Sequence, residues 1–181
     1  MYTRSFNIKL FFSLVLIFGL FSFQDNPKMK DTDTTAIVKA AYIYNFAKLI
    51  DWPSSNKQGN FIIGVYGQTN VYQELIKKYS AKRIGTQNIE IKKLSETPDV
   101  GDVHVLFIAK DNTKDLKSIL SYIEFEPVLV ITEDENTLDK GSVINFLIID
   151  NSLKFGLNIS EAQNRQLIIG SRLKDLAYKT E

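Results

Sequence analysis

The chain has 181 residues, of which 44% are hydrophobic and 24% charged, and its formal net charge at pH 7 is +1. These values are ordinary for a single globular domain, and the near-neutral charge gives no support to a polyanionic partner such as DNA. The sequence contains no cysteine, which excludes disulfide bonds, a thiol that senses redox state and a lipoprotein attachment site.

The first segment has the pattern of a secretory signal peptide. Arg4 and Lys9 form a short basic region, and the fourteen residues from Leu10 to Phe23 carry no charge. As a helix this stretch would span roughly 21 Å, which is short against a bilayer core of about 30 Å. The alternative is an uncleaved N-terminal anchor. We therefore predict a signal peptide over 1–23, a polar linker over 24–33 and a globular domain over 34–181.

The stretch from Ala36 to Pro53 predicts the helix around which the domain is organised. Small and apolar residues recur in it at steps of three and four, as they do along one side of a helix: Ala36, Ile37, Ala40, Ile43, Ala47 and Ile50. A helix this apolar must be covered by a sheet or by other helices. Pro53 is expected to stop it, and three residues could cap its start: Asp33, Thr34 or Thr35.

Strands and helices alternate after this helix. Uncharged apolar runs predict central strands that are buried on both faces, at Phe61–Tyr66, Val103–Ala109 and Val128–Ile131. Ile89–Leu94 alternates at its start and carries lysines, as an edge strand does. Helices are predicted after Thr69 or Asn70 and after Asp111 or Asn112. Strands separated by helices favour a mostly parallel sheet with right-handed crossovers.

The last part of the chain follows a different pattern. Ser142–Ile149 and Leu153–Ile159 are predicted to form a hairpin, joined by Asp150-Asn-Ser152. Ser160 fits the N-cap of a short helix, with Gln163 reaching back to it as in a capping box. An extended or buried linker and a terminal helix follow, at Leu167–Ile169 and Ser171–Ala177. The predicted fold is therefore a single α/β domain: a central, mostly parallel sheet, a C-terminal antiparallel hairpin and helices on both faces.

Several of these segments form a pattern when they are taken together. They are Ala41-Tyr-Ile-Tyr-Asn-Phe-Ala-Lys48 with Trp52-Pro53, Ile63-Gly-Val-Tyr-Gly67, His104-Val-Leu-Phe-Ile108, Val128-Leu-Val-Ile-Thr-Glu-Asp134, Lys154-Phe-Gly-Leu-Asn158 and Gly170-Ser-Arg-Leu-Lys-Asp-Leu-Ala177. This pattern closely resembles the YfiR family of small exported bacterial proteins, over roughly Ala36 to Ala177. The aromatic helix that ends in Trp-Pro and the Phe-x-x-Asn strand are its most specific parts.

The resemblance implies regulation rather than catalysis. The better-understood members are periplasmic repressors that bind the periplasmic portion of a membrane-bound diguanylate cyclase and hold cyclic-di-GMP synthesis, and with it biofilm formation, off. Members form homodimers, and some carry cysteine pairs that this sequence lacks. We therefore expect a periplasmic signalling regulator, without a cofactor, whose partner is a membrane cyclase or a sensor kinase. After signal cleavage we expect no stable membrane span.

Aromatic residues of the first helix are the candidate partner-binding residues: Tyr42, Tyr44, Phe46 and Trp52. Aromatic side chains bring a large contact area to an interface at a low cost in entropy. One narrow helix face cannot hold all of them together with the apolar stripe, so some of these rings should look outward. Packing in the core is the alternative for each ring.

A second set of residues could bind a small ligand. Gln68 and Asn70 follow the first predicted central strand, and Glu133 and Asp134 follow the last one. Open α/β sheets often place ligands at the carboxyl ends of their strands. The alternative function is therefore a periplasmic solute-binding module, and the alternative for the acidic run is a solvated loop.

The sequence contains no specific pattern of catalytic residues. His104 is the only histidine, so together with the lack of cysteine it cannot build a usual zinc site, and we predict a core or boundary position for it. The chain has no Gly-x-Ser-x-Gly elbow, and Gly64-Val-Tyr-Gly67 lacks the lysine of a phosphate loop. We expect no metal and no enzymatic activity.

Overall fold

The computed structural model of the chain describes residues 33–95 and 97–181. The predicted signal peptide and the predicted linker as far as residue 32 lie outside this part. Residues from Asp33 to Glu181 form one compact unit. Among the residues described, no helix combines the length and the hydrophobicity that crossing a membrane requires.

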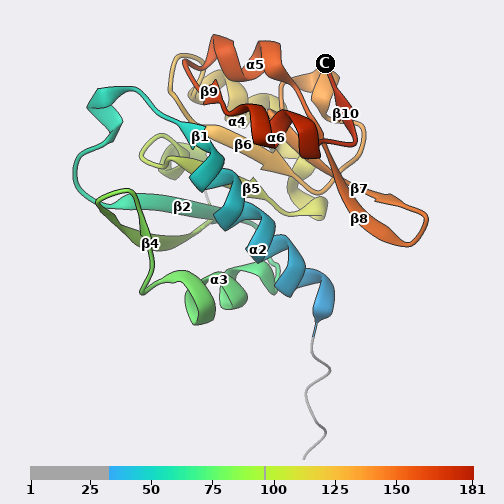
Figure 1. Cartoon of the computed structure of the whole chain (residues 1–181), viewed down its shortest axis with the longest axis horizontal. Helices are drawn as coiled ribbons and strands as arrows, with labels where there is room; N and C mark the ends of the chain where they lie inside the picture. Colours follow the sequence, from blue (N-terminus) through green and yellow to red (C-terminus); the bar gives the residue numbers. More distant parts are fainter. Residues whose placement is uncertain (1–32, 96) are drawn as a thin grey trace, which may run out of the picture. The chain divides into compact units, whose positions relative to one another are not determined.

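The domain is built on an eight-stranded sheet with the strand order β10-β8-β7-β6-β5-β2-β4-β3 (Figure 1). The strands from β4 to β7 pair in parallel, while β7 with β8 and β3 with β4 pair antiparallel. The strands are β2 (Phe61–Tyr66), β3 (Arg83–Ile84), β4 (Gln87–Leu94), β5 (Val105–Ile108), β6 (Leu129–Thr132), β7 (Ile144–Ile149), β8 (Ser152–Leu157) and β10 (Lys179–Thr180). This arrangement confirms the predicted fold class.

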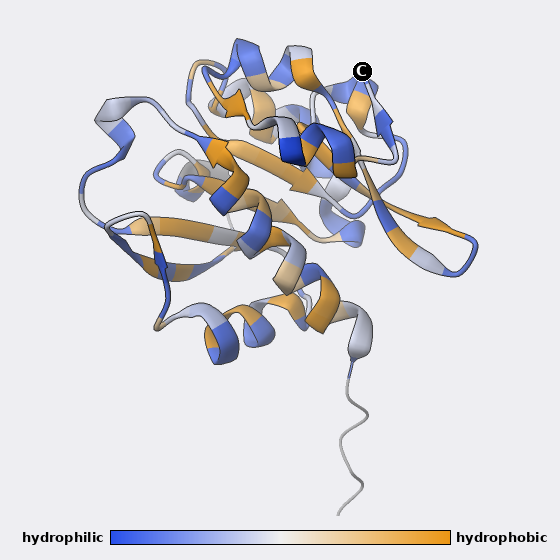
Figure 2. Ribbon diagram, in the orientation of Figure 1, coloured by the Kyte–Doolittle hydropathy of each residue, from blue (hydrophilic) through white to orange (hydrophobic). Residues whose placement is uncertain are grey.

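Helices cover both faces of this sheet. On one face lie α2 (Thr34–Leu49), α3 (Val71–Tyr79), α5 (Ile159–Asn164) and α6 (Ser171–Leu176), and on the other lies α4 (Leu116–Tyr122). Alternation along β5 supplies both cores, since Val105 and Phe107 join the α2 side and Leu106 and Ile108 join the α4 side. Figure 2 shows the matching concentration of hydrophobic residues in the strands.

Short 3₁₀ helices connect several of these elements. They are η1 (Ser54–Asn56), η2 (Thr97–Val100), η3 (Lys110–Asp115) and η4 (Leu138–Lys140). The segment η3 runs directly into α4, so the helix predicted to begin at Asp111 or Asn112 starts as a tighter turn. The short strand β3, which the sequence did not predict, covers the beginning of β4 at the edge of the sheet.

The helix α2 begins where the sequence allowed three alternatives. The Asp33 carboxylate accepts a hydrogen bond from the Ala36 backbone N–H at 2.9 Å and is the N-cap. Hydrogen bonds from Asn70 and Ala36 hold the pKa of Asp33 below its usual value. The helix ends at Leu49, earlier than Pro53 predicts, because Ile50–Asp51 forms β1 and pairs antiparallel with β9 (Ile168–Ile169).

The C-terminal hairpin is confirmed, but the helix after it begins earlier than predicted. Asp150 and Asn151 make the turn with φ values of 49° and 58°, as a two-residue hairpin loop requires. The Asn158 side chain, and not Ser160, caps α5, since its Oδ1 accepts from the Glu161 N–H at 2.8 Å. The predicted capping box is therefore wrong. Asn is as good an N-cap as Ser, and the strand ends immediately before it.

His104 lies at the boundary of the core, as predicted. It is 8% exposed, and its ring stacks on Phe61 with 4.5 Å between centroids. The Ile62 backbone N–H donates to Nδ1 at 3.1 Å, so the proton resides on Nε2, which donates to the Asn56 carbonyl at 2.7 Å. Burial lowers the pKa of His104 below its usual value of 6.5, and the hydrogen bond to Asn56 opposes this shift.

This geometry predicts a loss of stability on acidification. Because the folded protein binds the His104 proton less tightly than the unfolded chain, its contribution is complete above a pH of about 6.5 and declines as the pH falls below that value. Urea denaturation across this range should show the decline in the wild type. His104→Asn, which keeps an acceptor near the Ile62 N–H and does not titrate, should show less of it. Identical pH profiles for the two proteins would contradict the assignment.

Candidate functional sites

A groove of about 320 Å³ runs between α2 and α6 and reaches β8. Its floor is buried and apolar, with Phe46 1%, Phe155 2% and Leu173 0% exposed. Its rim includes Leu176, which is 59% exposed, and two cationic side chains, Lys48 and Arg172. We call this feature the α2/α6 groove, and define it by Tyr42, Phe46, Leu49, Phe155, Leu173 and Leu176.

The half-buried ring of Tyr42 connects this groove to the core. Its centroid lies 5.5 Å from that of Phe46, 5.8 Å from Phe155 and 6.0 Å from Phe146. Such a cluster of tilted and edge-on rings is favourable beyond the area it buries. One part of the Tyr42 ring is therefore held by the core while another part faces the groove, where a partner could reach it.

Tyr44 points to a different side of α2. Its ring stacks on Tyr79 of α3 at a centroid distance of 4.5 Å, and the Lys48 Nζ lies 5.5 Å from its centroid. Burial raises the pKa of Tyr79 above its usual value. Tyr44 is half-buried and does not line the α2/α6 groove. The structure thus places Tyr42 and Tyr44 on separate surfaces.

Trp52 and Phe46 require a correction, because the structure buries both rings. Trp52 is 5% exposed, packs edge-on against Phe61 at 5.0 Å, and donates from Nε1 to the Pro127 carbonyl at 2.9 Å. Its polar atom is already satisfied inside the fold, so we withdraw it as a partner-binding residue. Phe46 remains only as part of the groove floor. The sequence left packing in the core as the alternative for each ring, and the structure places the rings of Trp52 and Phe46 there.

A second pocket lies at the carboxyl ends of β2 and β6. It measures about 260 Å³ and brings together Asn70 and Glu133, two of the residues predicted to bind a ligand. The pocket also contains Asp33, the N-cap of α2, and Lys39 within α2, neither of which the sequence assigned to a site. One sequence feature could have indicated this pocket: Lys39 is a charged residue within a largely apolar helix. We call this feature the carboxyl-edge pocket.

The charged groups of the carboxyl-edge pocket already have partners within the chain. The Lys39 Nζ lies 2.9 Å from one Glu133 oxygen, and the Lys110 backbone N–H donates to the other at 3.0 Å. The Asn70 amide donates to Asp33 at 2.9 Å. A solute would have to compete with these contacts.

Gln68 and Asp134 do not line this pocket. The Gln68 Oε1 accepts from the Lys93 Nζ at 3.0 Å, and the Asp134 Oδ1 accepts from the Asn136 backbone N–H at 2.9 Å. Asp134 therefore stabilises its own turn, which weakens its case as a ligand-binding residue. Among the residues that the structure describes, no group of three or more His, Asp or Glu side chains is placed to hold a metal ion.

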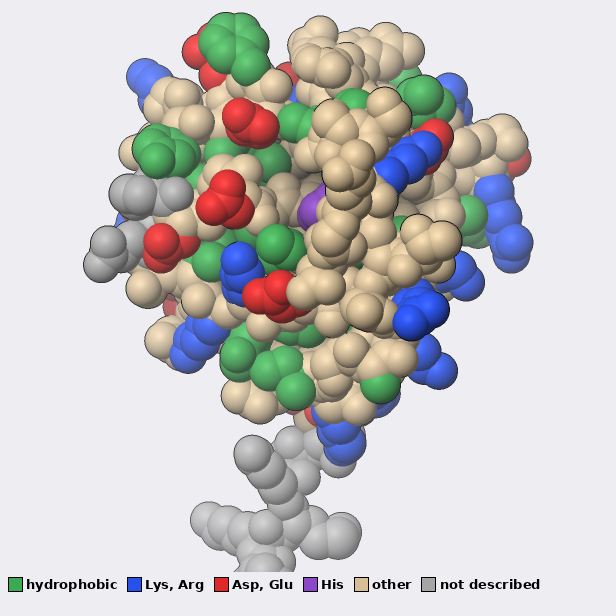
Figure 3. Space-filling view, turned by 90° about the vertical axis from the view of Figure 1, so that its left-hand side faces the viewer, with side chains coloured by type: hydrophobic (Ala, Val, Ile, Leu, Met, Phe, Trp, Pro, Cys, Tyr) green, Lys and Arg blue, Asp and Glu red, His purple; other side chains and the backbone are tan. Residues whose placement is uncertain are grey.

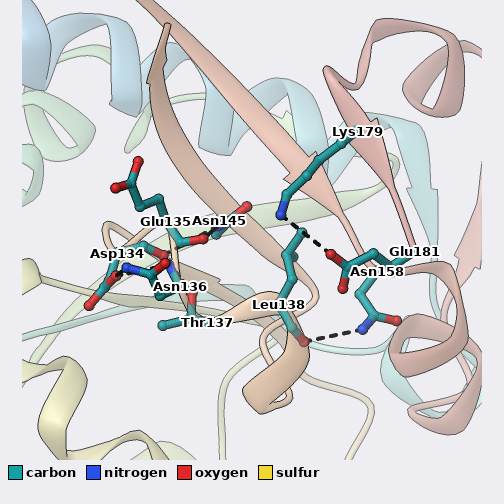
Figure 4. A network of polar contacts seen from close by, with 9 residues as sticks. All are labelled: Asp134, Glu135, Asn136, Thr137, Leu138, Asn145, Asn158, Lys179 and Glu181. Carbon is teal, nitrogen blue, oxygen red and sulfur yellow. Dashed lines mark hydrogen bonds and ion pairs between the residues drawn. The ribbon is translucent and has the colours of Figure 1, made fainter.

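Hydrogen bonds from a buried polar side chain, Asn145, hold the backbone of the acidic loop after β6 (Figure 4). The Asn145 amide donates to the Glu135 carbonyl at 2.7 Å and to the Asp134 carbonyl at 3.3 Å. Gly156, opposite Asn145 across the hairpin, makes room for it, because a Cβ there would lie 2.5 Å from the Asn145 Oδ1. These contacts fix the backbone of the loop that carries the run of carboxylates.

Comparison with known proteins supports the resemblance seen in the sequence. The model of the family described as YfiR/HmsC-like matches residues 36–178, which include every helix and strand of the domain except β10 and the first residues of α2. No curated protein matches the chain. Since the match extends over both α2 and α6 and over the whole parallel sheet, the chain belongs to the YfiR/HmsC-like family.

Proposed function

We propose that this chain is an exported, periplasmic regulator without enzymatic activity. In this proposal it binds the extracytoplasmic part of a membrane signalling protein, either a diguanylate cyclase or a sensor kinase. Membership of the YfiR/HmsC-like family supports a regulatory role. The observation that carries the binding site is the α2/α6 groove, where the exposed Leu176 stands over a buried apolar floor.

The chemistry of the groove indicates the kind of segment it would accept. Its floor would take apolar side chains, and Lys48 and Arg172 at its rim would favour neighbouring carboxylates. The half-buried Tyr42 adds a ring of the type that is enriched among interface residues with large energetic contributions. We therefore propose a partner segment with apolar anchors flanked by acidic residues.

Control of signalling follows if the groove binds one state of the partner more tightly than the other. Binding to the inactive conformer would hold cyclic-di-GMP synthesis off, and a stimulus that changes the relative affinity would release it. A change of about 1.4 kcal/mol in binding free energy alters the affinity tenfold, which is within the contribution of one buried aromatic contact.

A homodimer belongs to the same proposal, and the exposed Ile148 and Ile168 offer apolar surface outside the groove for it.

Gene replacement tests this function in the cell. Deleting the gene should raise cyclic-di-GMP, and the wild-type chain should restore the original level. Leu176→Asp should fail to restore it, because a carboxylate would stand at the rim of an apolar groove. Phe125→Asp is the matched control, since Phe125 is 80% exposed and lies outside the groove. An unchanged cyclic-di-GMP level after deletion would refute a diguanylate cyclase as the partner.

Solute binding at the carboxyl-edge pocket is the second candidate function. The convergence of Asn70, Glu133 and Lys39 around about 260 Å³ favours it. A small polar solute should then raise the melting temperature of the wild type and have a smaller effect on Asn70→Ala. The internal contacts of these groups make this the weaker candidate.

A further inference from the structure

A pocket on the α4 side of the sheet has no part in the proposed function. It measures about 400 Å³ and lies between the η3–α4 segment and the turn at Lys140. Its lining consists of Thr113, Lys114, Leu116, Lys117, Leu120 and Lys140. We call it the α4 pocket. It belongs to the face of the sheet opposite α2, so its role can be tested independently of the α2/α6 groove.

The charged side chains that line the α4 pocket all have one sign. Lys114, Lys117 and Lys140 line it, and no acidic side chain does so. In the part of the chain that the structure describes, none of these three ammonium groups forms a salt bridge. Converging cations without a counter-charge create a local positive potential that attracts an anion.

Another basic depression has cations that find partners within the chain. Lys48, Lys57 and Arg83 line a hollow of about 420 Å³ near β1 and β3. There Lys57 pairs with Asp51 at 2.7 Å and Arg83 donates to Asn88 at 2.9 Å. Figure 3, which views the domain from the left-hand side of Figure 1, shows basic side chains gathered mainly along one side of the surface, with acidic ones on the other. Positive charge alone therefore does not distinguish the two sites. A carboxylate, Asp51, lines the hollow and pairs with Lys57, whereas no acidic side chain lines the α4 pocket.

The floor of the α4 pocket is apolar and fixed. Leu116 is 3% exposed and belongs to the core behind the sheet, and Leu120 packs against the same core. Gly141 brings the opposite wall close, since a Cβ there would lie 2.7 Å from the Leu120 Cδ1. Its φ of +97° also favours glycine. The pocket thus combines a rigid apolar floor with a cationic rim.

We propose that the α4 pocket binds a small apolar molecule that carries a phosphate group. A phosphate monoester has a charge of about −1.5 to −2 at neutral pH, which matches several ammonium groups better than a single carboxylate does. Lysine binds phosphate as a compact point charge and needs no fixed bidentate geometry. The apolar part of the ligand would cover Leu116 and Leu120. Such a ligand could be free in solution or part of a lipid, and both share the same chemistry.

Calorimetric titration with hexyl phosphate tests the proposal. Saturable binding is expected, with an affinity that falls as salt is added. Inorganic phosphate lacks the apolar part and hexanol lacks the charge, so each should bind more weakly by about tenfold or more. Vesicles containing phosphatidic acid distinguish the source of the ligand: binding to them as well indicates a lipid, and binding of hexyl phosphate alone indicates a free molecule. Failure of hexyl phosphate to bind would overturn the proposal.

Variants then locate the binding. The double variant Lys114→Gln/Lys117→Gln should lower the affinity for hexyl phosphate about tenfold, as expected for two solvent-exposed ionic contacts. Lys57→Gln/Arg83→Gln, in the hollow near β1 and β3, should leave it unchanged. If the double variant does not fold, the affinity of Lys140→Gln, a variant of the opposite wall, provides a second measurement. Equal affinities in the variants of both sites would overturn the assignment to the α4 pocket.

Discussion

Replacing Trp52 with alanine is expected to lower the free energy of unfolding by about 3–5 kcal/mol, the usual cost of deleting a large buried ring. The ring is 5% exposed and packs edge-on against Phe61. Its loss leaves a cavity and also removes the donor that satisfies the Pro127 carbonyl. Chemical denaturation followed by far-UV circular dichroism measures this change.

Trp52→Phe is the matched control for this experiment. It keeps an aromatic ring in the core but loses the hydrogen bond from Nε1, so it should cost clearly less than the alanine variant. A loss below about 1 kcal/mol for Trp52→Ala would be the value of a surface position and would contradict the buried placement. The same result would return Trp52 to the set of partner-binding residues.

The largest expected effect on binding is at the rim of the α2/α6 groove. Leu176→Asp should weaken the complex with the extracytoplasmic part of the partner by about 30-fold or more, the effect of losing an interface hot spot of about 2 kcal/mol. Because Leu176 is 59% exposed, the melting temperature should change little. Titration calorimetry with the isolated partner region measures the affinity, and differential scanning calorimetry measures the melting temperature.

Tyr42→Ala and Phe125→Asp complete this comparison. Tyr42→Ala should lower both the affinity and the stability, since the ring touches the groove and also packs against Phe46 and Phe155. Phe125→Asp should lower neither, because Phe125 is exposed and does not line the groove. Equal affinities for the wild type and Leu176→Asp would remove the groove from the binding site.

The central part of the fold could be predicted from the sequence because its strands are buried on both faces. An uncharged run such as Phe61–Tyr66 or Val128–Ile131 indicates its environment by composition alone. The two-residue strands β1, β3, β9 and β10 could not be predicted as strands in this way. Their pairing depends on which segments meet in space, as when Ile50–Asp51 meets Ile168–Ile169.

The sequence predicted that the helix α2 carries the candidate site, but it could not predict which residues of α2 line the groove. Apolar side chains surround α2 on several sides, so periodicity cannot say which side the sheet covers and which side α6 leaves open. The difference between Tyr42, at the groove, and Trp52, in the core, arises from contacts with residues as distant in sequence as Phe155 and Pro127. The partners of Glu133 also come from two separate segments, at Lys39 and Lys110.

Amide hydrogen exchange of the domain, alone and with the partner's extracytoplasmic region, tests most directly whether this protein works through the α2/α6 groove. If the partner binds in this groove, exchange should slow in α6 and in the C-terminal half of α2 when the partner is present, with α4 unchanged. Slower exchange in α4 or around the carboxyl-edge pocket, with α6 unaffected, would contradict binding in the groove.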